Sequence, residues 1–142
     1  AWRASALISE ALQTNKPEQV DVALNLCLTA ININPKCEAA YNNAGACLFV
    51  KSLFGWGEAP ERASQKALEL ATQLLGNIQN SVTGYRVRGL AKTRQGDFRA
   101  ALSDLEKARE LNPNDSETAF GLSYALASLA RSEDAKECAM SA

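Results

Sequence analysis

The sequence predicts an all-helical fold built from stacked helix-turn-helix repeats. The spacing of small and large side chains recurs about every 34 residues along the chain. Turn-forming pairs such as Asn34-Pro35 and Asn112-Pro113 separate segments with helical periodicity, and no segment alternates polar and apolar residues as a strand would. The 142 residues, 46% hydrophobic and 22% charged, suit one globular domain.

The clearest repeat spans residues 82–115. Its fourth, eighth, twentieth, twenty-seventh and thirty-second positions are Tyr85, Gly89, Ala101, Ala108 and Pro113. Small side chains on both helices of a pair let the two backbones approach closely, while larger residues fill the remaining space. Gly96 suits the end of the first helix, and Pro113 cannot continue the second.

Two further segments keep the 34-residue register. In residues 4–37 the corresponding positions are Leu7, Ala11, Ala23, Ala30 and Pro35. In residues 116–142 they are Ala119, Ser123, Ala135 and Ala142. The segment between, residues 38–81, opens with Tyr41 and Gly45 at the fourth and eighth positions but has 44 residues, so we expect a ten-residue insertion near 51–60.

These repeats and turns predict about eight helices. We expect them near residues 3–14, 17–33, 37–50, 60–75, 81–94, 98–111, 115–129 and 132–141.

The pattern of large residues at position 4, small residues at 8, 20 and 27, and proline at 32 resembles the tetratricopeptide repeat. The resemblance implies a right-handed α-solenoid of about four repeats in a single domain, residues 1–142. It also implies a scaffold for protein-protein interaction, which binds a peptide segment or a partner domain in a concave groove without catalysis.

Composition argues against other classes of function. The chain has no histidine, and its four cysteines form no CxxC pair, so we expect neither an enzyme nor a metal site or cofactor. The net charge is -1 and charges of both signs are interspersed, which disfavours nucleic-acid binding. No apolar run is long enough to span a membrane, so we expect a cytoplasmic location.

The resemblance places the partner site on the first helix of each repeat. Carried over position by position, the groove residues are Asn42, Asn43, Phe49, Arg86, Leu90, Arg94, Phe120 and Tyr124. The aromatic residues would supply contact area, and Arg86 and Arg94 would pair with acidic groups of the partner. The alternative is that both arginines are simply solvated.

One subfamily of these repeats grips chaperone C-terminal carboxylates with a set of five polar residues. Only Asn43 fits that pattern here, because Ile8, Leu12, Thr83 and Val87 occupy the other four positions. We therefore expect a different partner.

Phe54 and Trp56 lie in the expected insertion. Either they fold back over their own repeat, which we favour, or they anchor a partner. The Trp-Gly pair and the helix after it are also similar to C-terminal repeat regions of bacterial adenylate cyclases and winged-helix transcription activators. That similarity implies an alternative: a regulatory domain of a longer bacterial protein, with an output portion preceding Ala1, that binds an effector or self-associates.

Overall fold

The computed structural model describes residues 17–141, and this part of the chain forms six helices and no strand. The helices are α2 (Pro17–Ile33), α3 (Glu38–Phe54), α4 (Pro60–Asn77), α5 (Val82–Gln95), α6 (Phe98–Leu111) and α7 (Ser116–Ser141). The expected helix at 3–14 lies outside the described residues.

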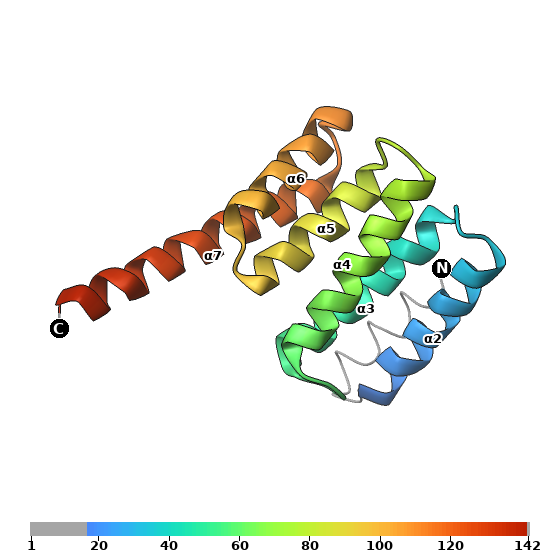
Figure 1. Ribbon diagram of the computed structural model, residues 1–142, viewed down its shortest axis with the longest axis horizontal. Helices are drawn as coiled ribbons and strands as arrows, with labels where there is room; N and C mark the ends of the chain where they lie inside the picture. Colours follow the sequence, from blue (N-terminus) through green and yellow to red (C-terminus); the bar gives the residue numbers. More distant parts are fainter. Residues whose placement is uncertain (1–16, 142) are drawn as a thin grey trace.

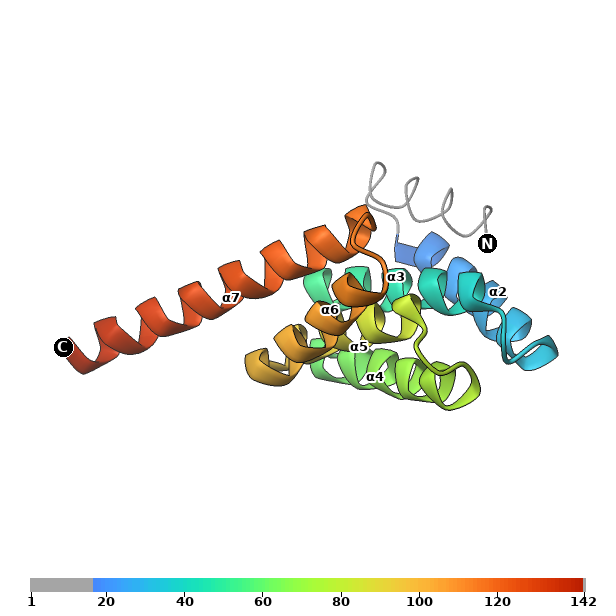
Figure 2. The ribbon, with the colours of Figure 1, turned by 90° about the horizontal axis from the view of Figure 1, so that it is seen from above.

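The helices follow one another in an antiparallel stack, with α2 at one end and α7 at the other (Figure 1). Each helix packs on the next, and α5 also packs on α3 and α7. The first helices of successive repeats, α3, α5 and α7, therefore adjoin one another. This is the arrangement expected when each pair buries its free face on the next pair, and Figure 2 shows it from above.

Small residues set the approach of the helices, as the sequence predicts. A side-chain carbon added at Gly45 would lie 2.9 Å from Val87, and one added at Gly89 would lie 2.6 Å from Leu105. Ala101 and Leu105 are fully buried beside Gly89. Close packing of this kind leaves room for hydrogen at these positions and for nothing larger.

Local signals also set the helix ends. The Ser81 hydroxyl accepts a hydrogen bond from the backbone N–H of Gly84 (3.1 Å) and caps α5. Gly96 ends α5 in the left-handed conformation at φ 85°. Pro60 begins α4, where a missing N–H costs nothing.

The expectation that the insertion near 51–60 separates helices at 37–50 and 60–75 is wrong for residues 51–54. Helix α3 continues to Phe54, and only residues 55–59 link it to α4. The extra length of this repeat lies mostly in helix: α3 has 17 residues and α4 has 18, against 14 each for α5 and α6. The Lys51 ammonium, paired with Asp21 on α2 at 2.7 Å, ties the added turn of α3 to its neighbour.

Trp56 packs against the hydrophobic core from the link. Phe54 stacks on Trp56 with ring centroids 4.9 Å apart but is itself 55% exposed. The favoured interpretation, in which the insertion covers its own repeat, therefore holds for Trp56 and only in part for Phe54.

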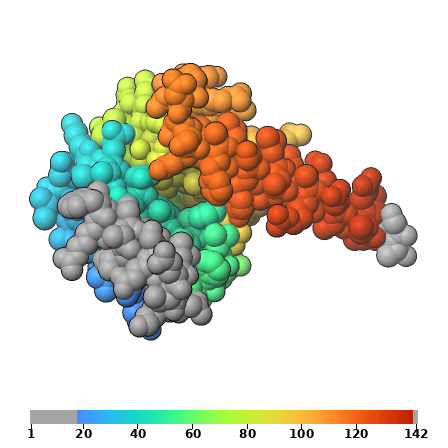
Figure 3. Space-filling model, turned by 180° about the vertical axis from the view of Figure 1, so that it is seen from behind, coloured from blue at the N-terminus to red at the C-terminus, as the bar shows by residue number. Residues whose placement is uncertain are grey.

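The prediction of separate helices at 115–129 and 132–141 is also wrong, because α7 runs unbroken over 26 residues. In the third repeat, Gly96-Asp97 separates the two helices, whereas the equivalent pair in the fourth repeat is Ala130-Arg131. Alanine and arginine both favour helix, so nothing in the sequence stops it. The C-terminal turns of α7 consequently project from the body of the molecule (Figure 3).

Two glycines test whether close packing sets the stack. Gly89→Ala should destabilise the fold by about 1–3 kcal/mol, because the methyl group meets Leu105 and the carbonyl of Ala101. Gly76→Ala should stabilise it by about 0.5 kcal/mol, because that helical glycine has open space around it. Urea unfolding followed by circular dichroism measures both, and equal effects would contradict the packing account.

Candidate functional site

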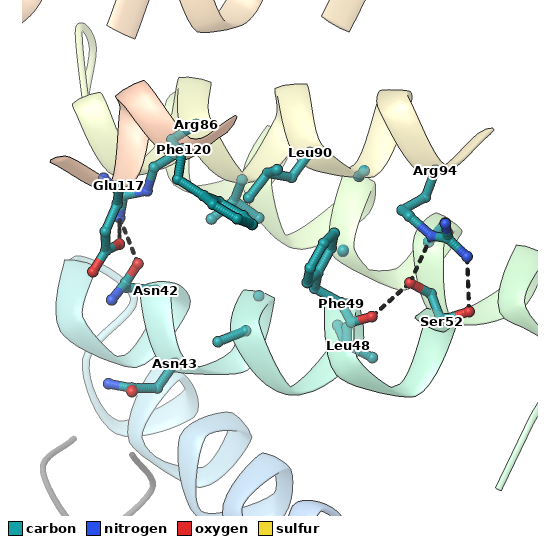
Figure 4. Close-up of a pocket in the computed structure, with 16 residues that line it drawn as sticks. Asn42, Asn43, Leu48, Phe49, Ser52, Arg86, Leu90, Arg94, Glu117 and Phe120 are labelled. Atoms are coloured by element: carbon teal, nitrogen blue, oxygen red, sulfur yellow. Dashed lines mark hydrogen bonds and ion pairs between the residues drawn. The ribbon is translucent and has the colours of Figure 1, made fainter. Parts of the chain in front are cut away.

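A pocket of 320 Å³ opens between α3, α5 and α7, and we call it the α3–α5–α7 pocket. Seven of the eight groove residues expected from the sequence line it: Asn42, Asn43, Phe49, Arg86, Leu90, Arg94 and Phe120. The eighth, Tyr124, packs on Phe49 and Phe120 just behind the lining. Figure 4 shows the pocket with α3 along one side and α5 along the other.

The middle of the pocket is apolar. Phe49 on α3 points toward Leu90 on α5, and Phe120 reaches in from α7 (Figure 4). Leu48 on α3 also lines this part of the pocket. Tyr124 fixes the aromatic wall, since it meets Phe49 edge-on at 5.4 Å between ring centroids and stacks on Phe120 at 6.1 Å. Phe120 remains 57% exposed, so this apolar surface is open to a partner.

Arg86 closes one end of the pocket. Its side chain is 8% exposed and contacts the Asp115 carboxylate at 2.7 Å and the Glu117 carboxylate at 3.0 Å. It also donates a hydrogen bond to the side-chain oxygen of Asn42 on α3. The expectation that Arg86 is simply solvated is therefore wrong, because acids of its own chain already pair with it. Its pairing with a partner's acids stays a prediction, which this arrangement disfavours.

The Asp115 carboxylate, which pairs with Arg86, is also affected by its surroundings. Burial opposes its ionisation, but hydrogen bonds from Thr118 and Arg86 and the positive charge of Arg86 prevail and lower the pKa of Asp115. The carboxylate therefore stays charged and joins α5 to the first turn of α7.

Arg94 lies at the opposite end and has different partners. Its Nε donates to the Ser52 hydroxyl at 3.1 Å, one terminal nitrogen donates to the Ser52 carbonyl at 2.9 Å, and the other donates to the Tyr124 hydroxyl at 2.9 Å. All three acceptors are neutral. Arg94 is therefore not simply solvated either, but unlike Arg86 it has no acidic partner among residues 17–141.

The sequence did not identify Ser52 or Asp115 as parts of this site. Ser52 lies in the expected insertion near 51–60, and the extension of α3 beyond residue 50 brings it to Arg94. Asp115 directly precedes α7, where an acidic residue usually indicates only the start of a helix. Its pairing with Arg86, 29 residues earlier in the chain, could therefore not be predicted from the sequence.

Within residues 17–141, no cluster of three or more Cys, Asp or Glu side chains is arranged to hold a metal ion. None of the helices described there is both long and apolar enough to cross a bilayer.

A family model described as tetratricopeptide repeat matches residues 92–141. The human RPAP3 first TPR domain has a similar structure, with a TM-score of 0.64 and 19% identity over 92% of this chain and 95% of that one. The chain folds as a tetratricopeptide-repeat domain.

Two other domains of this fold are similar. The first TPR of Spaghetti (RPAP3), bound to the HSP90 peptide SRMEEVD, has a TM-score of 0.61 and 18% identity, covering 92% of this chain and 95% of its own. The Arabidopsis OM64 TPR domain has a TM-score of 0.56 and 20% identity, covering 86% and 93%. At these identities the likeness concerns the repeat fold. No curated protein sequence matches the chain.

The pairing of Arg86 predicts a structural role for this residue in the repeat domain. Arg86→Gln should destabilise the fold by about 3 kcal/mol at pH 7, because it leaves Asp115 without its cation. Since folding lowers the pKa of Asp115, its stabilising effect is present above the unfolded value of 3.8 and is lost as pH falls through the folded value. The difference in the free energy of unfolding between Arg86→Gln and the wild type should therefore become smaller below about pH 4.

Denaturant unfolding at several pH values measures this difference. Arg99→Gln, at an exposed position on α6, is the matched control and should change stability by less than about 0.5 kcal/mol. Equal stabilities of the two variants at pH 7 would contradict the structural role of Arg86.

Proposed function

We propose that the repeat domain binds a peptide segment of a partner protein in the α3–α5–α7 pocket, without turnover. The observation that carries the proposal is the open apolar wall, in which Phe120 stays more than half exposed although Tyr124 holds its ring in place. An exposed, positioned aromatic ring beside a hollow is characteristic of a binding surface.

The size of the pocket indicates how a segment would fit. At 320 Å³ it lies at the lower end of the range for binding pockets, about 300–1,000 Å³. One or two apolar side chains of a longer segment would fill it, with the rest of the segment lying along α3 and α5. Such a partner gains affinity from apolar burial in the middle and from polar contacts at the ends.

The peptide complex of the Spaghetti domain supports a peptide as the class of partner. The residues of the chaperone clamp nevertheless differ here. Val87 is buried against Gly45, so its position serves helix packing, and Thr83 also replaces a cation of the clamp. Ile8 and Leu12 lie outside the described residues. The domain thus suits a less acidic, more apolar segment.

Two phenylalanines of nearly equal exposure allow a matched test. Peptides are selected from a random displayed library on the wild-type domain, and their dissociation constants are measured by fluorescence anisotropy. Phe120→Ala should weaken binding about tenfold or more, because it removes the exposed wall of the pocket. Phe54→Ala, which removes an equally exposed ring outside the pocket, should leave the affinity unchanged.

Loss of binding in Phe54→Ala with Phe120→Ala unaffected would place the partner on the insertion instead. If selection enriches no peptide, or if both variants bind like wild type, the proposed function is wrong.

The end of α7 favours a second candidate function, self-association. Residues 133–140 are all exposed, yet the family-model match extends through residue 141, so this segment carries the sequence of a second repeat helix. In the register of the repeats, this segment would pack on the first half of α7. It cannot do so within its own chain, because α7 is one unbroken helix. A second copy of the chain offers the same site, so two copies would exchange these segments.

Replacing Ala130-Arg131 by Gly-Asp restores the pair that ends α5 and lets the segment fold back on its own chain. Light scattering over a concentration series should then show a wild-type dimer and a monomeric variant. A monomeric wild type at all concentrations would refute the exchange.

A further inference from the structure

We propose that the segment bound in the α3–α5–α7 pocket carries a carboxylate at the Arg94 end and places an apolar side chain beside Phe120. This inference rests on the proposed function and adds the chemistry and direction of the ligand. Three features of the pocket lead to it: the bonding of Arg94, the contrast with Arg86, and the spacing along α5.

The guanidinium of Arg94 is held in place without being neutralised. A guanidinium has five N–H donors, and three of them bond the hydroxyl and carbonyl of Ser52 and the hydroxyl of Tyr124. No carboxylate in the described part of the chain lies within 4.0 Å of it. A fixed cation with two free donors at the rim of an apolar pocket is well prepared to bind an anion, because little side-chain entropy remains to be lost.

The other end of the pocket disfavours an anion. The charge of Arg86 is shared between Asp115 and Glu117, and the Glu117 carboxylate is 59% exposed at the pocket rim. A third carboxylate, brought there by a ligand, would be repelled by these two like charges. The Arg94 end of the pocket therefore favours a negatively charged group and the Arg86 end does not. A bound segment consequently has one preferred direction.

The spacing of residues along α5 relates the anion to the apolar anchor. Arg86, Leu90 and Arg94 recur every four residues and line the same side of the pocket (Figure 4). The four residues from Leu90 to Arg94 span about 6 Å of helix, and an extended peptide covers that distance in about two residues of about 3.3 Å each. The carboxylate should accordingly lie about two residues from the apolar side chain. It is supplied either by an Asp or Glu side chain or by a C-terminus.

A double-mutant cycle tests the pairing. The tightest library-selected peptide is synthesised with each acidic residue changed to its amide, and separately with an amidated C-terminus. Dissociation constants are measured by anisotropy for the wild-type domain, Arg94→Gln and the control Arg99→Gln, an exposed α6 arginine outside the pocket. Circular dichroism confirms that each variant is folded.

For the wild type and Arg99→Gln, one of these peptide changes should weaken binding about tenfold, because a charged hydrogen bond is lost. For Arg94→Gln the same change should have little effect. The affected peptide identifies the carboxylate as side-chain or C-terminal. Arg94→Lys should retain part of the charge effect, because it keeps the cation without the planar donors.

Equal losses in wild type and Arg94→Gln would overturn the inference, as would selection of peptides that lack an acid near the apolar residue. Both results leave the proposed function intact if Phe120→Ala still weakens binding. Only failure to select any peptide that depends on Phe120 would refute the proposed function itself.

Discussion

The buried charge of Arg86 is the constraint on which the site depends. A guanidinium with so little exposure must be neutralised, and its acceptors come from three places: Asn42 on α3, Asp115 before α7 and Glu117 in the first turn of α7. These contacts hold the three first helices in one arrangement and determine where α7 begins. Phe120 lies one turn further along α7, so the same constraint places its ring over the apolar floor.

Much of the fold could be predicted because it depends on local features. Helices α2 and α6 have the expected bounds, since proline and asparagine turns stop the chain where helical periodicity also ends. The continuity of α7 was missed because repeat register suggested a break, although Ala130-Arg131 lacks the glycine that a left-handed turn needs. At that point local propensity prevailed over the register of the repeat.

The candidate site was predicted less completely, for a different reason. Positions that face the groove follow from repeat register, and most of the expected residues do line the pocket. The partners of the two arginines depend on contacts between residues 29 to 44 positions apart, which no local pattern encodes. The sequence did not distinguish Arg86 from Arg94. Arg86 is a structural cation, whereas Arg94 lines the pocket with no acidic partner in the described part of the chain.

We propose that partners bind between α3, α5 and α7. The most direct test is to record ¹H–¹⁵N NMR spectra of the domain during titration with a library-selected peptide. Binding in this pocket should cause shift changes concentrated at Phe49, Leu90, Arg94 and Phe120, with none on α2, α6 or the link at residues 55–59. Changes centred on α2, α6 or that link, with the pocket residues unaffected, would contradict binding at this site.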